Sequence, residues 1–195
     1  MRILFGLGIS LLLAGTAFAD EALVAAAQDR LKHRVHYNGA YMKLDYPGGD
    51  VPAHIGVCTD VIIRSYRAAY GFDFQKAVHE DMKANFSAYP KIWGLKRTDR
   101  NIDHRRVPNL EAFLKRQGAD LGLSKLASDF KSGDLVSWRL PGNLPHIGIV
   151  SDRKARDGTP LIIHNVGAGP KEENVLFAYK IVGHFRYVPD TVAQD

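Results

Sequence analysis

Residues 56–71 read Gly56-Val57-Cys58-Thr59-Asp60-Val61-Ile62-Ile63-Arg64-Ser65-Tyr66-Arg67-Ala68-Ala69-Tyr70-Gly71. The apolar residues recur at helical spacing, which predicts an amphipathic helix over about residues 58–70. Gly71 stands where such a helix would stop. The Gly- and Pro-rich residues 46–52 cannot continue the helix backward. The pattern therefore predicts that Cys58 lies in the first turn of a helix.

Cys58 is the single cysteine of the chain, so it cannot form an internal disulfide. The free amides and the dipole of a first helical turn favour an anion, and the thiolate is the nucleophilic form of cysteine. Such a turn also offers N–H groups to an oxyanion. The segment alone is consistent with a nucleophile of lowered pKa or with a small buried side chain.

The N-terminus has the pattern of an export signal. Arg2 precedes an apolar run over residues 3–14, and Ala17-Phe18-Ala19 follows as a signal-peptidase site. The run is shorter than the roughly 20 apolar residues of a membrane span. We expect residues 1–19 to be a signal peptide cleaved after Ala19, no transmembrane segment after its removal, and a periplasmic or secreted protein.

The composition is that of one folded domain. The chain has 195 residues, of which 46% are hydrophobic and 24% charged, with a net charge of +5. The basic excess is dispersed, so nucleic acid is not expected as a partner. No Walker loop, dinucleotide fingerprint or zinc-type spacing is present, so we expect no cofactor and no metal. Residues 20–195 are expected to form a single domain and a monomer.

Three strands are expected downstream of the helices. Residues 135–140, residues 146–150 and residues 160–165 are apolar segments separated by polar or Gly-containing turns, which predicts an antiparallel meander. Alternation places His146 and Gly148 on one face. His164 and Asn165 must face opposite ways, so only one of the two can share the face of His146.

The order of a helix-borne Cys, a strand His and a polar residue on the next strand resembles that of papain-like enzymes of the NlpC/P60 superfamily, which cut peptide bonds in bacterial cell walls. The match is more specific to one exported bacterial family, known as domain of unknown function 1287. The segments that carry this resemblance are residues 56–64, 78–82, 101–110 and 183–187.

The resemblance implies an α+β, papain-like fold in which the cysteine helix packs on a small antiparallel sheet. It implies a cysteine peptidase or amidase with Cys58 as nucleophile, His146 as general base and acid, and His164 as the orienting residue. The family's substrate class would be a peptidoglycan peptide or another peptide or amide. Wall peptidases usually carry Asp-Cys-Ser-Gly at the nucleophile, whereas this chain has Val57-Cys58-Thr59-Asp60, so the substrate pocket need not be theirs.

Candidate substrate-binding residues lie next to the nucleophile and in a basic segment. Thr59, Asp60 and Asn165 would line the site. Arg105 and Arg106 belong to residues 96–106, which hold five Lys or Arg against two Asp, and Arg binds carboxylates bidentately. The alternative is a solvated loop in which Asp103 pairs with Arg105 to hold a helix that begins after Asn109.

Three other functions remain open from the sequence. The chain could be a cell-wall-binding protein of the same fold without turnover. Cys58, His146 and His164 could instead be zinc ligands. A thiol acyltransferase or transpeptidase is the third alternative, because an amine can resolve a thioester as well as water can.

Overall fold

The computed structural model describes residues 15–190, which form a mixed α+β structure with four α-helices and a five-stranded antiparallel sheet. The helices are α1 (Gly15–Arg30), α2 (Cys58–Tyr70), α3 (Phe74–Ala84) and α4 (Val107–Arg116). The strands are β1 (His36–Tyr37), β2 (Ile55–Gly56), β3 (Leu135–Leu140), β4 (Leu144–Lys154), β5 (Pro160–Asn165), β6 (Pro170–Glu173) and β7 (Lys180–Phe185).

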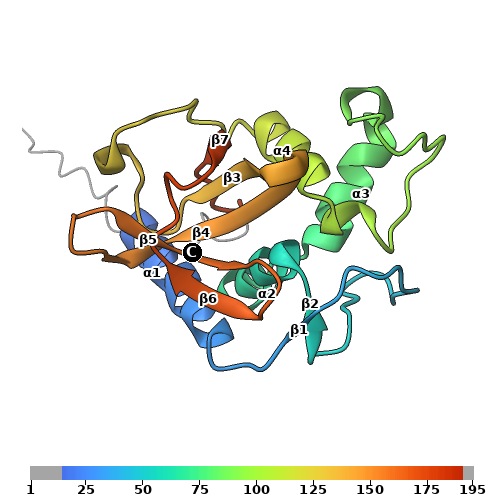
Figure 1. Cartoon of the computed structure of the whole chain (residues 1–195). Coiled ribbons are helices and arrows are strands. Elements are labelled where there is room, and N and C mark those ends of the chain that lie inside the picture. Colours follow the sequence, from blue (N-terminus) through green and yellow to red (C-terminus); the bar gives the residue numbers. More distant parts are fainter. Residues whose placement is uncertain (1–14, 191–195) are drawn as a thin grey trace, which may run out of the picture.

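The sheet has the order β6-β5-β4-β3-β7, and every neighbouring pair is antiparallel. The expected meander is confirmed as β3, β4 and β5, and β6 and β7 extend it at its two edges (Figure 1). A separate pair, β1 and β2, is parallel, with Tyr37 opposite Gly56. Strand β2 lies directly before the cysteine helix in the chain.

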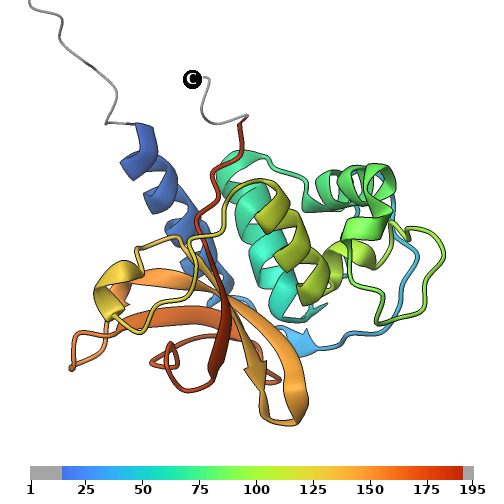
Figure 2. The same cartoon turned by 90° about the horizontal axis from the view of Figure 1, so that it is seen from above.

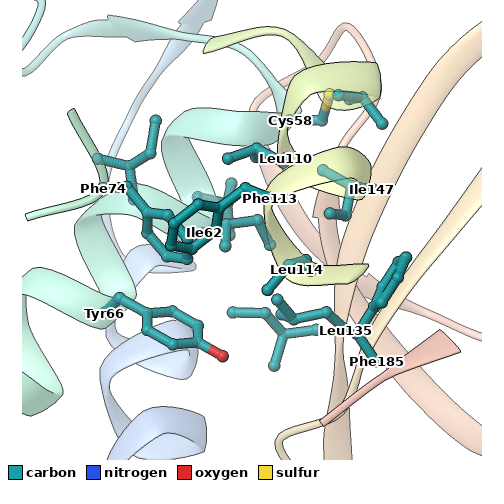
Figure 3. Packing of buried hydrophobic residues seen from close by; sticks show 14 of the residues in the cluster. Cys58, Ile62, Tyr66, Phe74, Leu110, Phe113, Leu114, Leu135, Ile147 and Phe185 are labelled. Atoms are coloured by element: carbon teal, nitrogen blue, oxygen red, sulfur yellow. The ribbon is translucent and has the colours of Figure 1, made fainter. Parts of the chain in front are cut away.

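The helices cover one face of the sheet. Helices α1, α2 and α4 all pack against β4, and Figure 2 shows them on the same side of the sheet. Side chains of α2 and α4 meet Leu135, Ile147 and Phe185 of the sheet in one buried cluster, drawn in Figure 3. The opposite face carries a second buried cluster around Trp138 and Val150. Both faces of β4 are therefore buried.

Helix α2 has the predicted bounds. Its first turn is capped by Asp60, whose Oδ2 accepts a hydrogen bond of 2.6 Å from the N–H of Val57, and Gly71 ends the helix with a φ of 64°. The expected start of α4, after Asn109, was wrong. Asn109 lies inside that helix, which begins at Val107, and its side chain donates to the carbonyl of Asp103 instead.

Residues 1–14 of the expected signal peptide lie outside the described residues. Residues 15–19 belong to α1, which runs through the expected cleavage site at Ala19. None of the helices in the described part of the chain combines the length and apolar character needed to cross a bilayer.

Gly148 allows β4 and β5 to approach closely beneath the two histidines. A Cβ at this position would lie 2.6 Å from Cγ2 of Ile162 and 3.1 Å from Cβ of His164. Distances under 3.0 Å between such atoms require the neighbour to move, and the side chain of a buried isoleucine has little room to do so. The absence of a side chain at Gly148 thus sets the position of His164.

We therefore predict that Gly148→Ala destabilises the protein by about 1–3 kcal/mol, because overpacking a dense core forces side-chain and backbone shifts. Urea unfolding monitored by circular dichroism measures this change. Gly39→Ala is the matched control, since its Cβ would make an ordinary 3.5 Å contact with Val57. Equal stabilities of the two variants would contradict the packing argument.

Candidate active site

Cys58 begins α2 and points into the interface between the helix and β4. The residue is 4% exposed, and it belongs to the same buried cluster as Ile147 (Figure 3). The N–H of Ile147 is close enough to hydrogen-bond the sulfur, as are the N–H groups of Cys58 and Thr59. The thiol thus meets β4 at its main chain, one residue after His146.

The pKa of the thiol is raised rather than lowered. Burial raises the pKa of Cys58 to about 11, while the three backbone N–H groups lower it by less and the charge of Asp60 raises it further. In this closed site, burial outweighs the lowering of the pKa that a helix start alone would give. The cost of burying a thiolate exceeds the stabilisation by the first helical turn, so the resting sulfur is protonated.

His146 lies on the face of the sheet opposite Ile147. It pairs across the ladder with Trp138, whose ring centroid lies 5.9 Å from that of the imidazole. Trp138 is itself fixed by a 2.9 Å hydrogen bond from its indole N–H to the carbonyl of Leu176. The ring of Trp138 therefore restricts the imidazole of His146 to a narrow range of orientations.

A chain of hydrogen bonds runs from His146 across two strands. Nε2 of His146 lies 2.8 Å from Nδ1 of His164 on β5, and Nε2 of His164 lies 3.0 Å from Oε2 of Glu173 on β6. Both histidines are buried, whereas the Glu173 side chain is 38% exposed. This chain of hydrogen bonds therefore leads from the interior of the protein to its surface.

Both imidazoles are neutral at pH 7. Burial, and to a lesser extent the neighbouring His164, lowers the pKa of His146 to about 4. Burial also lowers the pKa of His164, although Glu173 opposes that shift. Within residues 15–190 no hydrogen bond joins the thiol to His146. Cys58 packs with Ile147 on one face of the sheet, whereas His146 lies with Trp138 on the other face, so the structure does not bring the predicted nucleophile and base together at rest.

His164 is the residue that shares a face of the sheet with His146, and Asn165 points to the opposite face. The amide nitrogen of Asn165 donates to the carbonyl of Gly56 at 3.5 Å, and its oxygen accepts from the N–H of Gly167 at 3.3 Å. Asn165 therefore ties the end of β5 to the segment that enters the cysteine helix.

Arg105, Asp60 and Thr59 form a buried support under α2. Arg105 donates from Nε and Nη2 to the two carboxylate oxygens of Asp60, each at 2.9 Å, and the side chains are only 2% and 3% exposed. The hydroxyl of Thr59 donates to the carbonyl of Arg105 at 3.1 Å. The side-chain groups of Arg105, Asp60 and Thr59 that were expected to contact substrate therefore bond to other groups of the protein instead.

Arg106 is the more accessible of the two arginines. Its guanidinium lies 4.2 Å from the ring centroid of Trp93 and 3.3 Å from Asp103. The alternative pairing of Asp103 with Arg105 was wrong, because Arg105 pairs with Asp60 and Asp103 with Arg106. The basic segment is therefore held by two separate ion pairs.

Two further residues lie near the site although no sequence pattern indicates it. Glu173 joins the histidine pair only because β6 folds back along β5. Tyr37 of β1 is brought near Cys58 by the pairing with Gly56. Burial and, to a lesser extent, the nearby Cys58 and Asp60 together raise the pKa of Tyr37 to about 12. The Tyr37 side chain is 46% exposed.

Other polar groups lie apart from this site. His184 bonds to Asp134 at 2.7 Å and stacks on Phe130, which is a buried structural arrangement. A cavity of about 720 Å³ is lined by Tyr41, His79 and residues 94–101, and by neither Cys58 nor the two histidines. Within residues 15–190, no three His, Cys, Asp or Glu side chains are grouped in a way that could hold a metal ion.

Comparison with known proteins places this geometry in a family. The family model described as domain of unknown function (DUF1287) matches residues 24–187. The chain is also similar to a protein of Escherichia coli strain K12 described as "Uncharacterized protein YijF", with 55% identity over 166 residues. That match covers 85% of this chain and 80% of the relative. Residues 24–187, which the family model matches, contain every residue of the site.

The buried ion pair generates a stability prediction. Arg105→Ala should destabilise the fold by about 3–5 kcal/mol, because it leaves the Asp60 carboxylate buried without its partner. Arg153→Ala is the control, since its pair with Glu172 is largely exposed on the arginine side and should change stability by less than about 1 kcal/mol. Guanidinium unfolding compares the two, and losses of equal size would contradict a special role for the buried pair.

The raised pKa of Cys58 predicts slow alkylation in the folded protein. At pH 7, iodoacetamide should modify Cys58 more slowly than a free cysteine, whose pKa is about 8.5, and the rate should rise as the pH approaches 11. Mass spectrometry of the intact protein follows the reaction, with urea-unfolded protein as the control. Fast modification with an inflection near pH 7 would show that the resting thiol is ionised.

Proposed function

The chain belongs to the DUF1287 family, and from the geometry of its site we propose that it is an exported cysteine hydrolase that cleaves an amide bond. The observation that carries the proposal is the hydrogen-bonded chain His146–His164–Glu173, which begins one residue before the N–H of Ile147 that lies near the sulfur of Cys58 at the start of α2. A nucleophile, a base and a group that orients the base are the parts of an acyl-transfer site. A merely structural cysteine does not need them.

The first half of the reaction starts from a neutral thiol and a neutral imidazole. As Sγ of Cys58 attacks the substrate carbonyl carbon, its proton passes to His146, so ionisation accompanies attack rather than preceding it. The carbonyl electron pair moves to oxygen, and the N–H groups at the start of α2 donate to that oxyanion. Collapse breaks the carbon–nitrogen bond, and His146 gives its proton to the leaving amine.

The second half hydrolyses the thioester. His146 takes a proton from water as the water oxygen attacks the thioester carbon. The carbon–sulfur bond then breaks, which releases a carboxylic acid and returns the proton to Cys58. Because Cys58 is only 4% exposed, substrate can reach the sulfur only if the packing of α2 against β4 opens.

Cell-wall peptides are the substrate class we propose. The export signal expected over residues 1–19 would deliver the protein to the compartment that holds these peptides. The resemblance of the cysteine and histidine segments to NlpC/P60 enzymes points to the same bond type. An amine can resolve the thioester as well as water can, so both remain possible acceptors of the acyl group.

We predict that Cys58→Ala abolishes cleavage of purified wall fragments, with a loss on the order of 10⁴-fold or more, as for other catalytic nucleophiles. Mass spectrometry of the fragments identifies the bond that is cut, and added amines reveal transpeptidation. Ala68→Ser, on the exposed face of the same helix, is the control and should retain full activity. Cleavage by the Cys58→Ala protein at the wild-type rate would refute the nucleophile.

A further inference from the structure

We infer that Glu173 is a positioning residue that fixes the proton pattern of both histidines and leaves Nδ1 of His146 free to act as the base. The inference rests on the proposed function, because it assigns a role in the same reaction. It starts from two hydrogen bonds, His146 to His164 at 2.8 Å and His164 to Glu173 at 3.0 Å.

The first step concerns the proton of His164. A carboxylate accepts hydrogen bonds and donates none, whereas a neutral imidazole has one N–H and one lone pair. The bond to Glu173 therefore requires the N–H of His164 to be on Nε2. Its Nδ1 then carries the lone pair that faces His146.

The second step transmits this choice to His146. Because Nδ1 of His164 only accepts, Nε2 of His146 must be the donor across the 2.8 Å contact. The lone pair of His146 is then on Nδ1, the nitrogen that bonds to no other group within residues 15–190. A carboxylate on β6 thus determines which nitrogen of a histidine on β4 can accept a proton.

The third step concerns charge during the reaction. When Nδ1 of His146 accepts the thiol proton, the ring becomes an imidazolium in a site whose burial disfavours the charged form. Glu173 is the acidic group of this hydrogen-bonded chain, and His164 links its carboxylate to the imidazolium of His146. Lys171, 3.9 Å from Glu173, is the cation beside it, and both side chains are substantially exposed.

The neighbouring residue Glu172 supplies a matched control. Alternation along β6 turns it to the other face of the strand, where it accepts hydrogen bonds from Ser151 and from Arg153. A change at Glu172 removes a carboxylate from the same strand without touching the histidine pair.

The test uses the full mature protein and two readouts. Nitrogen-15 NMR of the imidazoles reports which ring nitrogen of His146 and His164 is protonated, independently of any substrate. The steady-state constants kcat and KM are measured on wall fragments. The variants are Glu173→Ala, which removes the acceptor, Glu173→Gln, which keeps an acceptor oxygen but removes the charge, and Glu172→Gln.

In the wild type we expect both rings to be protonated on Nε2. Glu173→Ala should give mixed tautomers in both rings and lower kcat by about 10- to 100-fold, less than the loss of a group in direct contact with the base, with KM changed less than about threefold. Glu173→Gln should keep the Nε2 tautomers and still lower kcat. Glu172→Gln should match the wild type in both readouts.

Unchanged tautomers in Glu173→Ala would overturn the inference, whatever the activity. Altered tautomers with an unchanged kcat would also overturn it, because the proton pattern would then not serve the reaction. If the wild type cleaves no amide bond, the proposed function fails, and with it the catalytic role of Glu173, while the NMR result still decides whether the carboxylate sets the tautomers.

Discussion

The buried pair of Asp60 and Arg105 is the interaction on which the site depends. Asp60 caps the N–H of Val57 and receives both arms of the Arg105 guanidinium. The outer Nη groups of Arg105 also lie 3.4 Å from the carbonyls of Asn38 and Ala40, in the segment that follows β1. One ion pair therefore fixes the first turn of α2, the loop beside Tyr37 and the basic segment around Arg105. Because these charges are enclosed, the pair sets geometry more than it adds stability.

The site itself is built from groups that are neutral at rest. Burial moves the pKa of Cys58 to about 11 and that of His146 to about 4, so in the proposed reaction charge would separate only during proton transfer. In such a site the fixed donors and acceptors matter more than a preformed thiolate. This explains why the hydrogen-bonded chain continues beyond the histidine pair to a carboxylate at the surface, where an ionised group costs little to maintain.

The sequence predicted the local parts of this arrangement and missed those set by distant pairing. The helical period and Gly71 were enough to give α2 its bounds, and strand alternation reduced the partner of His146 to His164 or Asn165. Choosing between them required the register, which depends on Gly148, because Cβ of His164 occupies space that a side chain there would crowd. Asp60 and Arg105 are 45 residues apart, and no spacing in the chain links them, so the pair was not foreseen. Glu173 was missed because its position depends on β6 returning along β5.

The enclosure of Cys58 has a second chemical effect. Oxidation of cysteine to sulfenic acid and beyond proceeds through an accessible thiolate. A protonated sulfur that is 4% exposed offers an oxidant little of the reactive thiolate and little surface to attack. The packing of α2 on β4 therefore slows oxidation of the only thiol in the chain.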